Sequence, residues 1–211
     1  GKQVALYEDE IVTNSKCEVN TWSDVTPTGT KPSARNTHSS ILYNGQMVMF
    51  GGRDDTGYRD DAWSLDLTTY AWALLTTTGT PGGRERHSSV VYNGKMFVFG
   101  GQNNDGLQNS VWTLDLTTFA WAEAGTTGTK PSARNSHSSI LYNGHMVVFG
   151  GIVFGSQLND AWSLDLTPNG SGNYAWTRIH DGSGTAPSAR GMHSSILYNG
   201  QMVVFLSLIH I

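Results

Sequence analysis

Apolar and polar positions follow one pattern that recurs along this chain. Residues 38–52 run from a histidine through two short apolar stretches to a Gly-Gly pair, and residues 87–101 and 137–151 repeat them almost unchanged. A fourth copy begins at His193 and keeps the pattern as far as Phe205. The marker histidines that open the copies are 49, 50 and 56 residues apart, and periods of this size indicate supersecondary repeats.

Each repeat is predicted to contain four strands. In the first copy, residues 39–43 lead to an Asn-Gly pair, which favours a two-residue type I′ hairpin because both residues tolerate positive φ. The return strand, 47–50, is apolar without alternation, as expected for a strand covered on both faces. After the Gly-Gly pair and a polar loop, residues 62–67 and 70–74 are predicted as the third and fourth strands, which completes one antiparallel sheet.

The recurring residues resemble kelch repeats. The resemblance rests on the Gly-Gly pair after an apolar strand, on an aromatic residue that precedes a Trp, and on the period near 50 residues, and it covers nearly the whole chain. It implies an all-β fold, a kelch-type β-propeller in which each repeat is one four-stranded blade around a central channel. We expect about three full blades and two half blades, with boundaries at 1–27 for the second half of a blade, 28–76, 77–126 and 127–181 for blades, and 182–205 for the first half of another.

The last six residues, 206–211, depart from the repeat, because Leu206 stands where a glycine is due. This hexapeptide resembles the translation of a sequencing adapter. We therefore expect it to be a non-native tail, and we expect the natural gene to continue beyond Phe205.

Composition and charge narrow the classes of partner. Thirteen Lys and Arg against seventeen Asp and Glu give a net charge of -4, which supplies no basic footprint for nucleic acid or an anionic membrane. No run of apolar residues approaches the length of a membrane span. The one cysteine, Cys17, excludes an internal disulfide framework and leaves the compartment open, with a lean to the cytoplasm.

The loops after the Gly-Gly pairs are the predicted partner-binding surface. The connections from strand two to strand three, and from strand four to the next blade, emerge at one end of the blades, and their sequences differ sharply between copies. The first loop is charged, the second is rich in amides and the third has an apolar tip. We expect a protein or peptide to contact Arg53, Asp54, Asp55, Tyr58, Arg59, Asn103, Asn104, Asp105, Leu107, Val153, Phe154 and Leu158. Neutral drift in unconstrained loops is the alternative explanation of this diversity.

An arginine three residues before each marker histidine offers another candidate site. These residues, Arg35, Arg84, Arg134 and Arg190, are expected either to ring the channel mouth and bind an anionic ligand or to pair with loop acids such as Asp61 and Asp160. The histidines lie one to a blade without a local cluster of ligands, so we expect no metal and no other cofactor. The tryptophans of the third and fourth strands are expected to pack the blades.

Three functions are consistent with this sequence. The first is a non-catalytic interaction scaffold that binds another protein through the loops joining strands two to three and four to one. The second is a fragment of a kelch-like enzyme of the copper or iron oxidase, specifier or sugar epimerase type, although no catalytic residue can be assigned. The third is a glycan-binding module that uses aromatic faces and the amide-rich loop.

Overall fold

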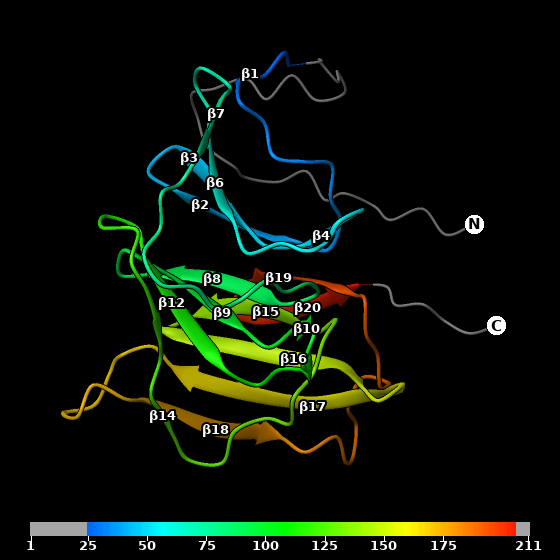
Figure 1. Ribbon diagram of the computed structural model, residues 1–211. Coiled ribbons are helices and arrows are strands. Elements are labelled where there is room, and N and C mark those ends of the chain that lie inside the picture. Colours follow the sequence, from blue (N-terminus) through cyan, green and yellow to red (C-terminus); the bar gives the residue numbers. More distant parts are fainter. Residues whose placement is uncertain (1–24, 206–211) are drawn as a thin grey trace.

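The computed structural model describes residues 25–205, and in this range the chain forms strands and turns only. Three sheets and one hairpin follow the four copies (Figure 1). Blade 1 contains β2 (Ser39–Tyr43), β3 (Gln46–Phe50), β6 (Ala62–Asp66) and β7 (Ala71–Leu74), and blade 2 contains β8 (Ser88–Tyr92), β9 (Lys95–Phe99), β12 (Val111–Asp115) and β13 (Trp121–Glu123). Blade 3 contains β15 (Ser138–Tyr142), β16 (His145–Val153), β17 (Ser156–Asp165) and β18 (Tyr174–His180), and the fourth copy forms the hairpin β19 (Ser194–Tyr198) and β20 (Gln201–Phe205). The expected tail at 206–211 and almost all of the half blade expected at 1–27 lie outside the described residues.

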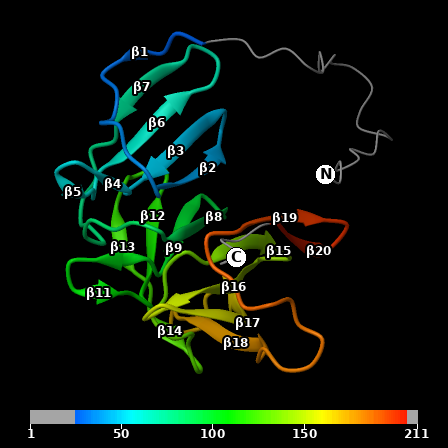
Figure 2. The same ribbon diagram turned by 90° about the vertical axis from the view of Figure 1, so that its right-hand side faces the viewer.

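The blades are arranged around a common centre. Figure 2 looks onto one end, where the first strands β2, β8, β15 and β19 lie nearest the centre and β7, β13 and β18 lie on the outside. Within each blade all four strands pair antiparallel, and the predicted Asn-Gly turns join the first two strands. In the first of these turns φ is 47° at Asn44 and 75° at Gly45, the left-handed values that a type I′ turn requires.

The hydrophobic core lies between the blades. Alternate side chains of β9 face opposite ways: Met96 and Val98 join a cluster with blade 1, whereas Phe97 and Phe99 join a cluster with blade 3. All four are almost fully buried. This double coverage explains why β9 is apolar at all four positions after Lys95.

Two strand boundaries differ from the sequence prediction. The fourth strand of the first copy was expected to begin at Tyr70, but φ is 55° there, and it is also 55° at the equivalent Phe119 of blade 2, so each residue closes the turn before its strand. The Asp66 carboxylate accepts the main-chain N–H groups of Thr68 and Thr69 in this turn, and Asp115 does the same in blade 2. The recurring Asp-Leu-Thr-Thr sequence therefore builds a side-chain-supported turn.

The segments after the Gly-Gly pairs, which the sequence predicted as loops, form small hairpins. In blade 1, β4 (Arg53–Asp54) pairs with β5 (Gly57–Tyr58), and in blade 2, β10 (Gln102–Asn103) pairs with β11 (Gly106–Leu107). In blade 3 the pairing of β16 and β17 continues past Gly151 to the tip. Glycines at positive φ and side-chain-capped turns give these short polar ribbons a defined shape, although they lack the hydrophobic pattern of a strand.

An outer strand that the sequence did not reveal completes the blades. The linker strand β1 (Thr28–Gly29) pairs parallel to β7, β14 (Thr126–Thr127) pairs parallel to β18, and Thr78 forms the equivalent bridge to Ala120. Each segment precedes the blade that it completes, and Thr78 and β14 follow the fourth strand of the blade before. Thus the connection between blades also covers the edge of the next sheet.

Glycine and histidine form a repeated seam between neighbouring blades. The ring of His137 in blade 3 packs against Phe99 of blade 2, with ring centroids 5.1 Å apart, and a Cβ on Gly100 would lie 2.8 Å from the His137 ring. His87 packs in the same way on Phe50, and His193 on Phe149. The second glycine of each pair donates its N–H to the carbonyl of the next blade's arginine, as Gly101 does to Arg134 at 2.9 Å.

Gly100→Ala should therefore destabilise the chain far more than Gly94→Ala. Both glycines belong to blade 2 and have φ near 70°, so both substitutions carry a left-handed penalty of about 1–2 kcal/mol. Only at Gly100 would the methyl group also clash with the next blade, which adds about 1–3 kcal/mol. Urea unfolding of the two variants measures the difference, and equal losses would show that the close approach is unimportant.

Candidate functional site

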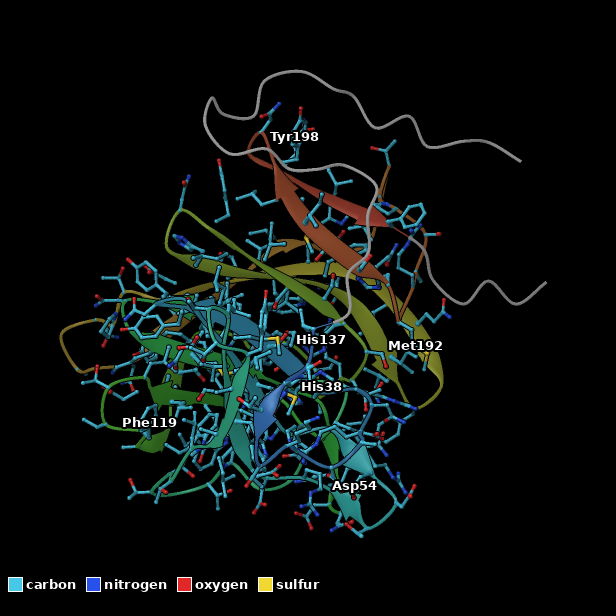
Figure 3. The ribbon with its side chains drawn as sticks, turned by 90° about the horizontal axis from the view of Figure 1, so that it is seen from above. His38, Asp54, Phe119, His137, Met192 and Tyr198 are labelled. Carbon is cyan, nitrogen blue, oxygen red and sulfur yellow. The ribbon has the colours of Figure 1, made fainter. Side chains whose placement is uncertain are left out.

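The loop-rich end of the blades brings most of the predicted partner-binding residues together. Figure 2 faces this end, and Figure 3 shows Asp54 and Met192 toward it and Phe119, from a tight turn, toward the opposite end. Asp55, Asn104, Asp105 and Phe154 are exposed at the tips of the hairpins, whereas Val153 and Leu158 are half-buried where β16 and β17 pair. The surface is therefore built from three adjacent hairpins of different chemistry.

In the blade-1 hairpin, the charged side chains mostly interact with one another. Asp54 accepts hydrogen bonds from the Ser33 hydroxyl at 2.6 Å and from the Thr56 main chain at 2.9 Å, and Arg59 lies 3.4 Å away. These hydrogen bonds, that from Ser33 foremost, hold the pKa of Asp54 below its ordinary value. Arg53 lies over the Tyr58 ring, 5.0 Å from its centroid. The Tyr58 side chain is thus half-covered and not a protruding anchor.

A hollow lies between the hairpins of blades 2 and 3. Its volume is about 280 Å³, and its lining combines apolar side chains with amides. The lining residues are Gln102, Gly106, Leu107, Asn135, Ile152, Phe154 and Gly155. Asn103 supports one wall, because its side-chain oxygen accepts hydrogen bonds from the Asp105 main chain and the Gln108 amide. The hollow can receive an apolar side chain and a few hydrogen-bonding groups.

Asn135 lines this hollow and carries a buried acceptor without a partner in the described part of the chain. Its side chain is 5% exposed, and its Nδ2 donates to Gln102 Oε1 at 2.8 Å. Its Oδ1 is buried and has no hydrogen-bond partner among residues 25–205. A buried polar atom without a partner is costly, so a donor supplied from outside would be favourable here.

The channel mouth is a second hollow at the same end, of about 360 Å³. The marker histidines and the residues immediately before them line it: Thr37, His38, Arg86, His87, Ser136, His137, Met192 and His193. The residues before the histidines have φ between 55° and 59°, and three of their N–H groups bond the carbonyl of the preceding member, as Ser136 N bonds Arg86 O at 2.9 Å. Sequence reasoning missed these four residues. The sequence did contain a signal for them: the residue before each marker histidine differs between the copies, although the histidine itself does not change.

The arginines that stand three residues before the histidines, Arg35, Arg84, Arg134 and Arg190, do not line this mouth. The Arg134 guanidinium is buried and forms a bidentate pair with Asp160 at 2.7 and 2.9 Å, and it also donates to the carbonyl of Gly150. Arg35 pairs likewise with Asp61. Burial raises the pKa of Asp160, but hydrogen bonds from Arg134 and Trp162 outweigh it and hold that pKa below its ordinary value. Arg190 donates to Ser188. Neither Arg190 nor Arg84 has a carboxylate within 4 Å among the described residues, and of these two only Arg84 belongs to a complete four-stranded blade.

The positions of the described side chains give little support for a metal site or a sugar-binding site. In residues 25–205, no three His, Cys, Asp or Glu side chains are grouped so that they could hold a metal ion. Trp63, Trp121, Trp162 and Trp176 are buried and therefore not available as stacking platforms. No helix of the described chain is long and apolar enough to cross a membrane.

The repeated blades, their Gly-Gly seams and the central mouth define a kelch-repeat β-propeller domain. The chain matches the KLHDC2/KLHL20/DRC7 Kelch-repeats domain over residues 2–206, and it belongs to this family of kelch-repeat domains. The all-β kelch fold predicted from the sequence is thereby confirmed.

Two known proteins illustrate the extent of the similarity. Tip elongation aberrant protein 3 of Schizosaccharomyces pombe (strain 972 / ATCC 24843) is 32% identical over 80 residues, which cover 37% of this chain and 7% of that protein. A solved structure titled "Structure of YjhT" superimposes with a TM-score of 0.66 at 18% identity, over 81% of this chain and 58% of that one. At this identity the structural likeness shows the fold alone. The chain spans only a small part of the first protein and little over half of the second.

Acidification should destabilise the domain through its seam histidines. Burial lowers the pKa of His87 and His137 to about 3, with the neighbouring arginine charges adding to the effect. The unfolded chain takes up these protons first, near pH 6.5, so the stability is complete above that pH and falls as the pH drops toward 3. Each such histidine contributes a slope of up to about 1.4 kcal/mol per pH unit.

His137→Gln should flatten this slope between pH 6.5 and 5, a range above the titration of ordinary carboxyl groups. Denaturant unfolding at several pH values measures the slope. His145→Gln, at a partly exposed position at the start of β16, is the matched control. His145→Gln should keep the slope of the unmodified chain. The burial explanation is wrong if His137→Gln keeps that slope as well.

Proposed function

We propose that this kelch domain is a protein-interaction module that binds a segment of its partner in the hollow between the blade-2 and blade-3 hairpins. Kelch membership supports the general role, and the chemistry of the hollow supports this location. An apolar side chain of the partner would lie between Leu107, Ile152 and Phe154. Main-chain groups of the same segment would meet the amides of Gln102 and Asn135.

Phe154 is the observation that carries this proposal. Its side chain is 92% exposed at the tip of the β16–β17 hairpin, and its φ of 47° is a left-handed value that is unfavourable for an aromatic residue. An exposed aromatic side chain in a strained turn, next to a hollow, has the properties of an interaction anchor. Covering this ring with a partner would remove its large apolar surface from water.

The buried acceptor of Asn135 adds specificity to the apolar contact. Its Oδ1 is buried and has no partner within the described chain, so a partner segment that turned this side chain toward the hollow would satisfy it with a main-chain N–H. The charged blade-1 hairpin beside it presents Arg53, Asp55 and Asp60 at the surface, where they would orient an oppositely patterned partner.

Phe154→Ala should weaken partner binding by at least tenfold, as expected when a central aromatic anchor is truncated. Peptides selected from a random displayed library against the unmodified chain provide the ligands, and biolayer interferometry measures their affinities. Asn135→Ala tests the acceptor with the same peptides.

Tyr198→Ala is the control for this experiment. Tyr198 is also an aromatic side chain, 63% exposed, but it lies beside the Asn-Gly turn of the β19–β20 hairpin, away from the hollow (Figure 3). Binding within twofold of the unmodified chain is expected for this variant. The proposal fails if the selected peptides bind the Phe154 variant as tightly as they bind the Tyr198 variant.

A further inference from the structure

Blade 2 breaks a charge pairing that blades 1 and 3 share. In blade 3 the Arg134 guanidinium is paired with the Asp160 carboxylate, which also accepts the Trp162 indole N–H at 2.7 Å. Blade 1 has the same three groups in Arg35, Asp61 and Trp63. In each of these two blades, a carboxylate thus accepts hydrogen bonds from both a guanidinium and an indole N–H. We call this arrangement the charge-pairing unit.

In blade 2 the carboxylate of this unit is replaced by the hydroxyl of Ser110. The register shows the equivalence, because Trp63, Trp112 and Trp162 face Met49, Val98 and Val148, which each stand two residues before a Gly-Gly pair. Ser110 and Asp160 each stand two residues before their tryptophan. Serine carries no charge, and its Oγ lies 3.5 Å from Arg84 NH1, at the limit of a hydrogen bond.

The guanidinium of Arg84 also lacks the serine partner that Arg134 has in blade 3. Arg134 donates its Nε to the Ser132 carbonyl and its NH2 to the Ser132 hydroxyl. In blade 2 the corresponding stretch is Pro81-Gly82-Gly83, and Arg84 reaches only the carbonyls of Pro81 and Gly100 and the distant Ser110 hydroxyl. Arg84 Nε is buried without a hydrogen-bond partner in the described part of the chain.

Arg84 nevertheless remains as buried as Arg134, since each residue is 1% exposed. Burial lowers its pKa to about 10, so the group is still protonated at neutral pH. A buried cation without a counter-charge is strongly unfavourable, whereas the same cation beside an anion is well tolerated. The surroundings of Arg84 therefore favour the binding of a negatively charged group beside its guanidinium.

We propose that blade 2 binds a small monovalent anion of the halide class, chloride under ordinary conditions, between Arg84, Ser110 and Trp112. The guanidinium, the serine hydroxyl and the indole N–H are all hydrogen-bond donors, and in the sister blades the equivalent arginine and indole groups hold carboxylate oxygens. The burial of Arg84 favours a single small ion over a phosphate or a side chain from another protein.

Glu123 is the competing source of negative charge. It faces Trp112 across the β12–β13 pair, and its carboxylate raises the pKa of Arg84 against the effect of burial. Its side chain is exposed, and it forms no ion pair with Arg84 within 4 Å in the described structure. The experiment below separates these two counter-charges.

Thermal unfolding of the whole chain in sodium chloride, compared with sodium gluconate at equal ionic strength, tests the site. Chloride at roughly ten times its dissociation constant should raise the midpoint by about 3–6 °C. Ser110→Asp, which restores the carboxylate, should abolish this dependence. Conversely, Asp160→Ser should create a second chloride-dependent site in blade 3. Chlorine NMR line broadening, present for the unmodified chain and lost in Ser110→Asp, measures binding directly.

The unmodified chain alone can overturn the proposal. If chloride neither shifts its midpoint nor broadens the chlorine resonance, no halide site exists, whether or not the substituted chains fold. If chloride dependence appears only in Glu123→Gln, then Glu123 is the counter-charge and the proposal is wrong.

Discussion

The close approach of main chains at the Gly-Gly pairs is the constraint on which the rest of the structure depends. The first glycine lies so near the next blade's histidine and arginine that a side chain has no room, and the second donates its N–H to that arginine's carbonyl. These contacts join the start of each innermost strand to the end of the second strand in the blade before. They also fix where the hairpin that follows the glycines leaves the sheet.

Two kinds of information in the sequence predicted the fold. The Asn-Gly turns and the apolar second strands are local signals. The structure confirms the turns, which have positive φ, and it shows β9, between two neighbouring blades, covered on both faces. The linker strands β1 and β14 could not be predicted, since two residues carry no periodicity and their partners lie more than forty residues away, as Thr28 and Ala71 do. The outer strand could therefore be recognised only once the arrangement of whole blades was known.

The candidate site was only partly foreseeable for a related reason. Variation between copies pointed to the hairpins after the Gly-Gly pairs, and their residues do gather at one end of the blades. Whether a side chain there is free or already engaged depends on contacts between hairpins, however. Tyr58 and Phe154 are both aromatic loop residues, but Arg53 covers the first and nothing in the described chain covers the second. Likewise, Asn135 becomes notable only because Gln102, from another blade, occupies its amide nitrogen and leaves its oxygen unpaired.

The linker strands also give the domain a direction of assembly. The segment that covers the outer edge of a sheet is made before the rest of that sheet, as β14 precedes all four strands of blade 3. During synthesis from the N-terminus, the fourth strand of a blade is made last, and it meets an outer strand that directly follows the blade before, as β18 meets β14. A fourth strand therefore spends little time as an exposed edge, the state in which β-proteins are most prone to pair with other chains.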